Sequence, residues 1–318
     1  MVLLLCCLLS APVLADDFPG EVYELGAFER FEASGVSYFA GRLAVVDDTL
    51  NSLFLFDARG GSIETLDAER LPSQRAKFED VAFHPESKTF FAVGSHEGWT
   101  EEALRQLSVL LEFRLADIGT IEEDSVRRLP LWEGFDKLGL WKPKGMKVEG
   151  LAVDASGETL YVGLREPADR ARVYSVSLAS LRRGEPELSL VLEFDAGSAD
   201  ETAYCISALT WEPTHEGLLI ATSTEEEASH RFLGNRLWFA PLSSPDGREG
   251  SDADVVLLWD RFDVGMKAEG LALGAGKLFI VYDNDQDDTG IPSRLRVVPL
   301  DAILRKIDPS SPFATNVP

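Results

Sequence analysis

The stretch GMKVEGLAV at residues 145–153 recurs almost unchanged as GMKAEGLAL at residues 265–273. Each copy runs into a turn and then into a second apolar segment, residues 160–164 and residues 278–282. A self-similar unit of this length is typical of repeat architectures. The sequence therefore predicts a protein built from copies of one strand-rich unit.

Alignment on this motif finds five units, whose centres are 45 to 70 residues apart. In each unit a first strand, a turn and a second strand precede a third strand that ends in a Leu-containing bend, such as residues 177–180 and 299–302. A fourth strand usually follows. Units of this length suit the four-stranded blades of a β-propeller. We predict an all-β fold, a β-propeller with five blades; six blades stay open, because the 70-residue interval could hide one more.

The last unit has no fourth strand after its bend, so the ring needs a strand from elsewhere. The unassigned strand at residues 21–25 could supply it. Such closure removes the open sheet edge that a circular array would otherwise expose. We expect one propeller domain over residues 16–318, with short helices only at residues 101–111 and 300–306.

Residues 1–15 have the composition of a secretory signal peptide. An apolar run from Val2 to Leu9, too short to span a bilayer, precedes small residues that suit cleavage after Ala15. The expected location is therefore the periplasm or the extracellular medium. Cys205 is the only cysteine that such cleavage would leave, so we expect no intramolecular disulfide and a buried thiol.

The formal net charge of −24, from 30 Lys plus Arg against 54 Asp plus Glu, limits the partners. It argues against nucleic acid and against electrostatic docking on anionic lipid. It favours solubility and the binding of cations. The partner that we expect is a small-molecule or polymeric extracellular ligand.

The repeat also predicts a functional face. In a propeller all first strands line the channel in the same direction, so the residues that begin them form a ring: Glu79, Glu149 and Glu269 with Ser34 and Ser207. Adjacent strands are antiparallel, so the residues that end the second strands face this ring. They are Asp47-Asp48, Ser95-His96, Arg165-Glu166, Ser223-Thr224 and Asp283-Asn284-Asp285.

Crowded carboxylates raise each other's pKa or bind a cation. Oxygen ligands without clustered Cys or His favour Ca²⁺ or Mg²⁺ over zinc, so Glu79, Glu149, Glu269, Asp47 and Asp283 are candidate ligands for Ca²⁺. Two alternatives stay open. Arg165, Lys147 and Lys267 could neutralise the glutamates, or the glutamates could cap strands through backbone N–H groups.

Two weaker signals lie near this face. The series Asp283-x-Asp285-x-Asp287 resembles the start of a calcium loop, but Asp288 replaces the required Gly and Arg294 stands where Glu belongs. A solvated acidic loop is the better interpretation. His96 could act as a base or a ligand, or be a polar channel residue without a catalytic role.

The sequences FEDVA at residues 78–82 with GSH at 94–96, and VEGLA at 148–152 with GLREP at 163–167, resemble an uncharacterised bacterial family of secreted domains. More distantly they resemble phytase-like and esterase-like propellers. The resemblance implies a propeller and no settled activity. Asp80 departs from the pattern, because the other Glu-led units have Gly there.

Two functions of different classes fit these residues. The first is a metal-dependent hydrolase of phosphate esters, esters or lactones, with Ca²⁺ on the glutamates and Asp283, His96 as a base and Arg165 stabilising anionic charge. The second is a non-catalytic propeller whose same face binds a ligand or a protein while the carboxylates fix loops.

Overall fold

The computed structural model describes residues 18–25, 31–58, 64–72, 76–116, 119–226, 231–242, 255–283 and 292–308. The expected signal peptide and the acidic loop with Asp285 and Asp287 lie outside the described residues. Within them, no helix is both long and apolar enough to cross a membrane.

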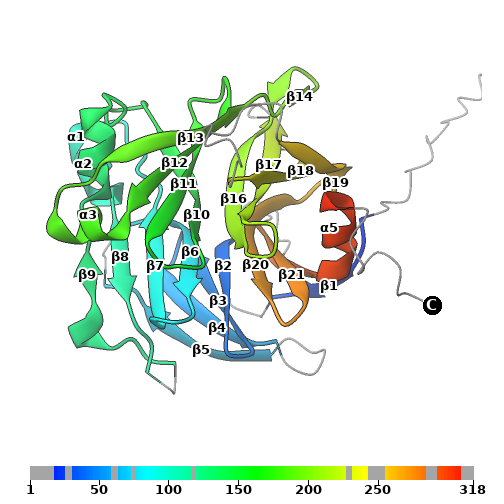
Figure 1. Cartoon of the computed structure of the whole chain (residues 1–318), viewed down its shortest axis with the longest axis horizontal. Coiled ribbons are helices and arrows are strands. Elements are labelled where there is room, and N and C mark those ends of the chain that lie inside the picture. Colours follow the sequence, from blue (N-terminus) through cyan, green and yellow to red (C-terminus); the bar gives the residue numbers. More distant parts are fainter. Residues whose placement is uncertain are drawn as a thin grey trace, which may run out of the picture.

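Five four-stranded antiparallel sheets are arranged around a central channel, as the repeat predicts (Figure 1). From the channel outward, the first three blades are β2 (Ala33–Phe39), β3 (Arg42–Asp47), β4 (Ser52–Asp57), β5 (Glu64–Arg70); β6 (Phe78–His84), β7 (Thr89–Gly94), β8 (Leu110–Phe113), β9 (Arg127–Arg128); and β10 (Lys147–Val153), β11 (Thr159–Glu166), β12 (Ala171–Ser177), β13 (Leu188–Phe194). The other two are β16 (Cys205–Glu212), β17 (Gly217–Glu226), β18 (Arg231–Pro241), β19 (Val256–Phe262); and β20 (Lys267–Gly274), β21 (Lys277–Asp283), β22 (Arg294–Pro299), β1 (Glu21–Glu24). The five-blade fold is therefore confirmed.

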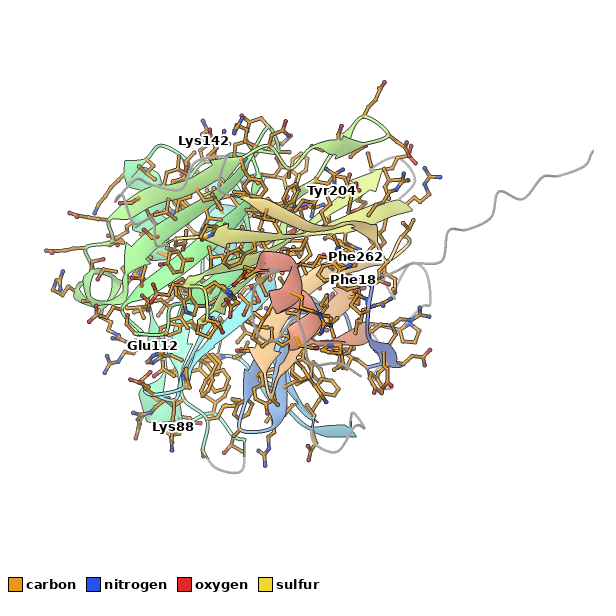
Figure 2. All side chains as sticks on the ribbon, turned by 45° about the vertical axis from the view of Figure 1, so that its right-hand side comes forward. Phe18, Lys88, Glu112, Lys142, Tyr204 and Phe262 are labelled. Carbon is orange, nitrogen blue, oxygen red and sulfur yellow. The ribbon has the colours of Figure 1, made fainter. Side chains whose placement is uncertain are left out.

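The N-terminal strand closes the ring, as expected. β1 pairs antiparallel with β22, with Glu21 opposite Val297. Just before it, the buried Phe18 stacks on Phe262 at 4.1 Å between ring centroids (Figure 2). The first blade also packs on the fifth through a shared apolar cluster that includes Val36 and Phe279. Closure thus combines strand pairing with core packing.

The long interval between the second and third units holds helices and loops, not a sixth blade. It contains α1 (Glu101–Leu107), a 3₁₀ turn (Glu123–Ser125) and α2 (Leu131–Lys137).

The expected helix at 101–111 ends early, because Leu110–Phe113 pairs with β7 as β8. The bends expected at 177–180 and 299–302 begin the helices α3 (Leu178–Arg183) and α5 (Leu300–Ile307). A two-stranded hairpin, β14 (Ser198–Ala199) and β15 (Thr202–Ala203), precedes the fourth blade.

Every inner strand contains a β-bulge at the same place. The register of each inner strand with its neighbour shifts around one residue: Ser34, Glu79, Glu149, Ser207 and Glu269. A bulge adds an unpaired residue and redirects its side chain. We call these five buried residues the bulge ring.

The glycines after the bulge residues follow from the narrow channel. A Cβ on Gly270 would lie 2.7 Å from the backbone nitrogen of Val36 in the next blade. At Gly270 the neighbouring inner strand therefore approaches too closely for a side chain, whereas Asp80 and Ala208 occupy the same position in the second and fourth blades.

Candidate functional site

The glutamates of the bulge ring lie together at one end of the channel, where they are paired with basic side chains. Lys147 Nζ lies 2.5 Å from Glu149 Oε1 and 3.9 Å from Glu79 Oε1. Lys267 Nζ contacts Glu269 Oε1 and lies 3.9 Å from Glu149 Oε1. The two lysines thus connect glutamates of three blades.

Arg165 and Lys77 extend this network. Arg165 Nη1 donates to Glu149 Oε2 at 3.0 Å and to Ser223 Oγ at 3.4 Å. Lys77 Nζ lies 3.7 Å from both Glu79 Oε1 and Asp48 Oδ2. We call the three glutamates with Lys77, Lys147, Lys267 and Arg165 the ionic cluster.

The pKa values of Glu149 and Glu269 are shifted in opposite directions, although the two residues occupy equivalent places in their blades. Burial acts to raise the pKa of Glu149, but Arg165, Lys147 and Lys267 hold it below its ordinary value. Burial raises the pKa of Glu269 well above its ordinary value, since Lys267 alone opposes it and Glu149 adds repulsion. The two equivalent carboxyl groups therefore have pKa values shifted in opposite directions, downward at Glu149 and upward at Glu269.

These carboxylates do not fit a calcium ion as they stand. Ammonium groups lie where a cation would sit, and no group of three His, Cys, Asp or Glu side chains in the described residues is arranged to hold a metal. Calcium requires six to eight oxygen ligands. The Ca²⁺ hypothesis stays a prediction, and no chemical step is assigned to it here.

The two aspartates predicted as ligands lie at the ends of second strands. Asp47 accepts hydrogen bonds from the backbone N–H groups of Glu32, at 2.7 Å, and Leu50, so it fixes the turn after β3. Burial raises the pKa of Asp47 to about 7. Asp283 ends β21 opposite Lys267. Strand capping, expected for the glutamates, is therefore the role of Asp47.

His96 does not reach the ionic cluster. It is fully buried, its Nδ1 lies 2.8 Å from the carbonyl oxygen of Gly94, and its ring contacts Phe135. Burial lowers the pKa of His96 to about 4. A neutral, inaccessible imidazole suits a core residue and not a base at the channel mouth.

Asp80 follows the bulge residue Glu79 on β6 and lies between the two ends of the channel. Its Oδ2 accepts from the Leu151 backbone N–H of the next blade at 2.7 Å, and its Oδ1 accepts from Val81 N–H at 2.8 Å. Burial raises its pKa well above the ordinary value, although these bonds and one from Leu209 N–H act against the shift. The departure from Gly at this position therefore links blades across the channel.

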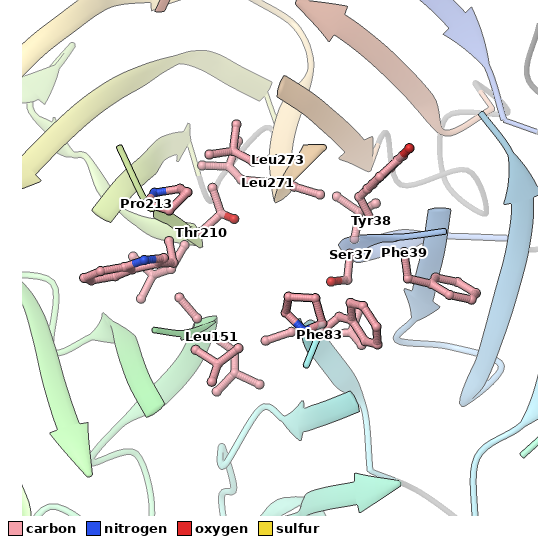
Figure 3. A pocket seen from close by; sticks show the side chains of 18 of the residues that line it. Ser37, Tyr38, Phe39, Phe83, Leu151, Thr210, Pro213, Leu271 and Leu273 are labelled. Carbon is pink, nitrogen blue, oxygen red and sulfur yellow. The ribbon is translucent and has the colours of Figure 1, made fainter. Parts of the chain in front are cut away.

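The other end of the channel opens into a cavity of about 500 Å³, which we call the apolar cup (Figure 3). All five inner strands and four of their following turns line it. Its deeper wall contains Val36, Val81, Leu151, Leu209 and Leu271, and its rim contains Tyr38, Phe39, Phe83, Trp211 and Leu273.

The aromatic rings of the rim are held by neighbouring blades. Tyr38 stacks on Phe279 with ring centroids 5.5 Å apart, and Trp211 stacks on Tyr161 at 5.7 Å. A Cβ on Gly274 would overlap the Tyr38 ring, so glycine is required beside it. The rim is therefore fixed before any ligand arrives.

Sequence reasoning missed the cup and one member of the ionic cluster. The pattern Lys-x-Glu occurs in three units, at Lys77, Lys147 and Lys267, and it would have identified Lys77. The cup could have been found from the large residues four places after the bulge residue, Tyr38, Phe83 and Trp211. Cys205, as expected, is a buried free thiol.

Comparisons with known proteins identify neither a family nor an activity. No protein-family model matches the chain. No curated protein sequence matches it either. A chain of a nidogen/laminin complex is 15% identical with a TM-score of 0.45, over 79% of this chain and 72% of that one. A luciferin-regenerating enzyme is 14% identical with a TM-score of 0.41, over 84% and 78%.

The β-propeller domain of Cps50 (Swd1) from Myceliophteria thermophila is 15% identical with a TM-score of 0.40, over 84% of this chain and 73% of that one. Similarities at this level carry no argument about activity. The chain is thus a β-propeller, and the resemblance to a bacterial secreted family stays a prediction.

Proposed function

We propose that the protein is a non-catalytic binding propeller that holds a neutral, largely apolar small molecule in the apolar cup. The observation that carries this proposal is the cup itself, about 500 Å³ in volume and walled by all five blades. Small-molecule sites are typically concave and mostly apolar, with volumes of about 300–1,000 Å³. The stacked rim also supports binding, because fixed side chains lose little entropy when a ligand is bound.

The polar groups of the cup favour a ligand with hydrogen-bond acceptors. The hydroxyl groups of Ser37 and Thr210 point into the cup from opposite walls (Figure 3). The indole N–H of Trp211 is buried and has no hydrogen-bond partner. A carbonyl or ether oxygen on the ligand would satisfy these donors.

The charge around the cup selects against anions. Glu86 and Asp154 lie at its rim, and no Lys or Arg lines it. The net charge of −24 acts in the same direction. A neutral ligand therefore fits better than a carboxylate or a phosphate.

Binding of N-phenyl-1-naphthylamine, a neutral apolar fluorophore, tests the proposal. We expect saturable binding to the wild type and its loss in Thr210→Phe, which fills the cup. Thr202→Phe, on the β14–β15 hairpin outside the cup, is the matched control and should bind like the wild type. Equal binding by Thr210→Phe and the wild type would contradict the proposal, as would binding without saturation.

The metal-dependent hydrolase stays a prediction. A panel of phosphatase, esterase and lactonase substrates, with and without a chelator, tests it directly. Chelator-sensitive turnover that survives Thr210→Phe would favour the hydrolase over the binding propeller.

A further inference from the structure

Four arginines converge on a second cavity, far from the channel. The cavity measures about 500 Å³ and is lined by residues at β9 in the second blade and in α3. We call it the arginine cleft; its lining is Arg127, Arg128, Leu129, Pro130, Leu181, Arg182, Arg183 and Gly184. Among the residues that the structure describes, no Asp or Glu lines it. This concentration of positive charge stands out in a chain with a net charge of −24.

Two of the guanidinium groups are held in place at one end. Arg182 donates from Nε at 3.0 Å and from Nη2 at 2.6 Å to the same oxygen of Glu112. Arg128 donates from Nη2 to the backbone carbonyl oxygens of Ser108, at 3.3 Å, and Arg105, at 3.4 Å. Each side chain therefore keeps N–H donors that these bonds do not use.

The cleft has little counter-charge of its own. In the described part of the chain, Glu112 forms the only ion pair with these four arginines, and it lies on the outer side of the molecule (Figure 2). Arg127 is the cross-strand neighbour of Glu112 on β9, yet the carboxylate is taken by Arg182 of the third blade. Arg127 and Arg183 are exposed and make no described ion pair. The positive charges of these arginines repel one another, and a bound anion would offset that repulsion.

We propose that the arginine cleft binds the oxyanion group of a small phosphate or sulfate monoester. Guanidinium groups match tetrahedral oxyanions with paired N–H···O bonds, which a lysine cannot reproduce. Leu129 and Leu181 are buried in the core beside the cleft, so half-buried Pro130 supplies the apolar contact for the organic part of such a molecule. The site is independent of the cup, which selects a neutral ligand.

Isothermal titration with phenyl phosphate, phenyl sulfate and inorganic phosphate, at constant ionic strength, tests this inference. The phosphate and sulfate arms distinguish the two sources of the oxyanion, and inorganic phosphate measures the share of the organic part. We expect saturable binding of at least one aryl ester. Arg127→Ala/Arg183→Ala should weaken it at least about tenfold, because two charge-assisted contacts are removed.

The control is Arg70→Ala/Arg231→Ala, which removes two exposed arginines from the first and fourth blades and changes the net charge equally. It should keep the wild-type affinity within about twofold. Arg182→Lys keeps the positive charge but loses the planar guanidinium group, so it should also weaken binding of the aryl ester. Fluorophore binding in the cup should not change in this variant. The inference is overturned if the wild type binds none of the three probes, or if both double variants lose affinity equally.

Discussion

The two ends of the channel are lined by the same five strands, yet they differ in chemistry. At one end the bulge ring gathers three glutamates, and basic side chains surround them at 2.5–3.9 Å. At the other end the same strands present alkyl and aromatic side chains to a cavity of about 500 Å³. A few residues along each strand thus separate a filled ionic interior from an open apolar one.

This comparison indicates which end of the channel has room for a ligand. In the ionic cluster each buried charge already has a partner of the protein's own, so a ligand would have to displace it. In the cup the deeper wall is already buried, but the half-exposed side chains of the rim remain in contact with solvent, and their burial by a ligand is favourable. Charged residues are conspicuous in the sequence, but the apolar cup is the part of the channel with space for a ligand.

The strongest test of this comparison is the pair Glu149→Gln and Glu269→Gln. Glu149→Gln should lower the free energy of unfolding by about 3–5 kcal/mol, because it leaves buried Lys147 and Arg165 without their carboxylate. Glu269→Gln should cost no more than about 1 kcal/mol, since burial and repulsion from Glu149 already disfavour the charged form of Glu269. Urea unfolding at neutral pH measures both. Equal losses would show that the two glutamates carry the same charge.

Asp80→Leu should break the division between the two ends. It leaves the backbone N–H groups of Val81 and Leu151 without acceptors, so we expect a loss of about 2–3 kcal/mol in the same urea experiment. Asp80→Asn keeps an acceptor and should lose less. A stable Asp80→Leu variant would mean that water replaces the carboxylate.

Asp48, at the ionic end, should contribute to the pH dependence of stability. Burial, with repulsion from Glu79, raises the pKa of Asp48 to about 6, so the folded state binds this proton more tightly than the unfolded chain. The stability from Asp48 is therefore present below about pH 4 and lost as the pH rises toward 6, with a slope of up to about 1.4 kcal/mol per pH unit. Asp48→Asn should flatten the wild-type slope between pH 4 and 6.

Thr210→Phe, at the apolar end, is the control for that titration and should leave the slope unchanged. A flattened slope in Thr210→Phe would indicate that the two ends titrate as one unit.

Arg165→Lys should have the smallest effect. It keeps the positive charge beside Glu149 but loses the second arm toward Glu225, so the cost should be about 1 kcal/mol. Binding of the neutral fluorophore in the cup should not change. Loss of fluorophore binding would place the ligand at the ionic end instead.

The sequence predicted five blades, the closing strand and the convergence of the three glutamates, but it left a sixth blade open in the 70-residue interval. All three follow from aligning one repeated motif, because equivalent positions in a propeller must form a ring. It was not sufficient for the partners of those glutamates. Lys77 begins its unit two residues before Glu79, but whether its ammonium group reaches the carboxylate depends on the bulge, which no single unit reveals.

His96 and the cup show the same limit. His96 follows a strand like the other polar residues of the second-strand ends, but the chain turns it toward Phe135 in the core. The cup arises from the distance between five strands, and that distance depends on contacts between neighbouring blades, such as the close approach of the Tyr38 ring to Gly274. Neither the orientation of the His96 side chain nor the size of the cup can be inferred from the motif spacing within one unit.

The pairing of β1 with β22 also governs how the protein can be made. Glu21 is synthesised long before its partner Val297, so during translation the first strand waits unpaired while four blades form behind it. Contacts between such distant segments form slowly, because a long loop must close first. Until the final blade emerges, the growing chain exposes sheet edges at both ends of its array. The ring can thus be completed only after β22 has left the ribosome, and a chain cut short before β22 would stay open.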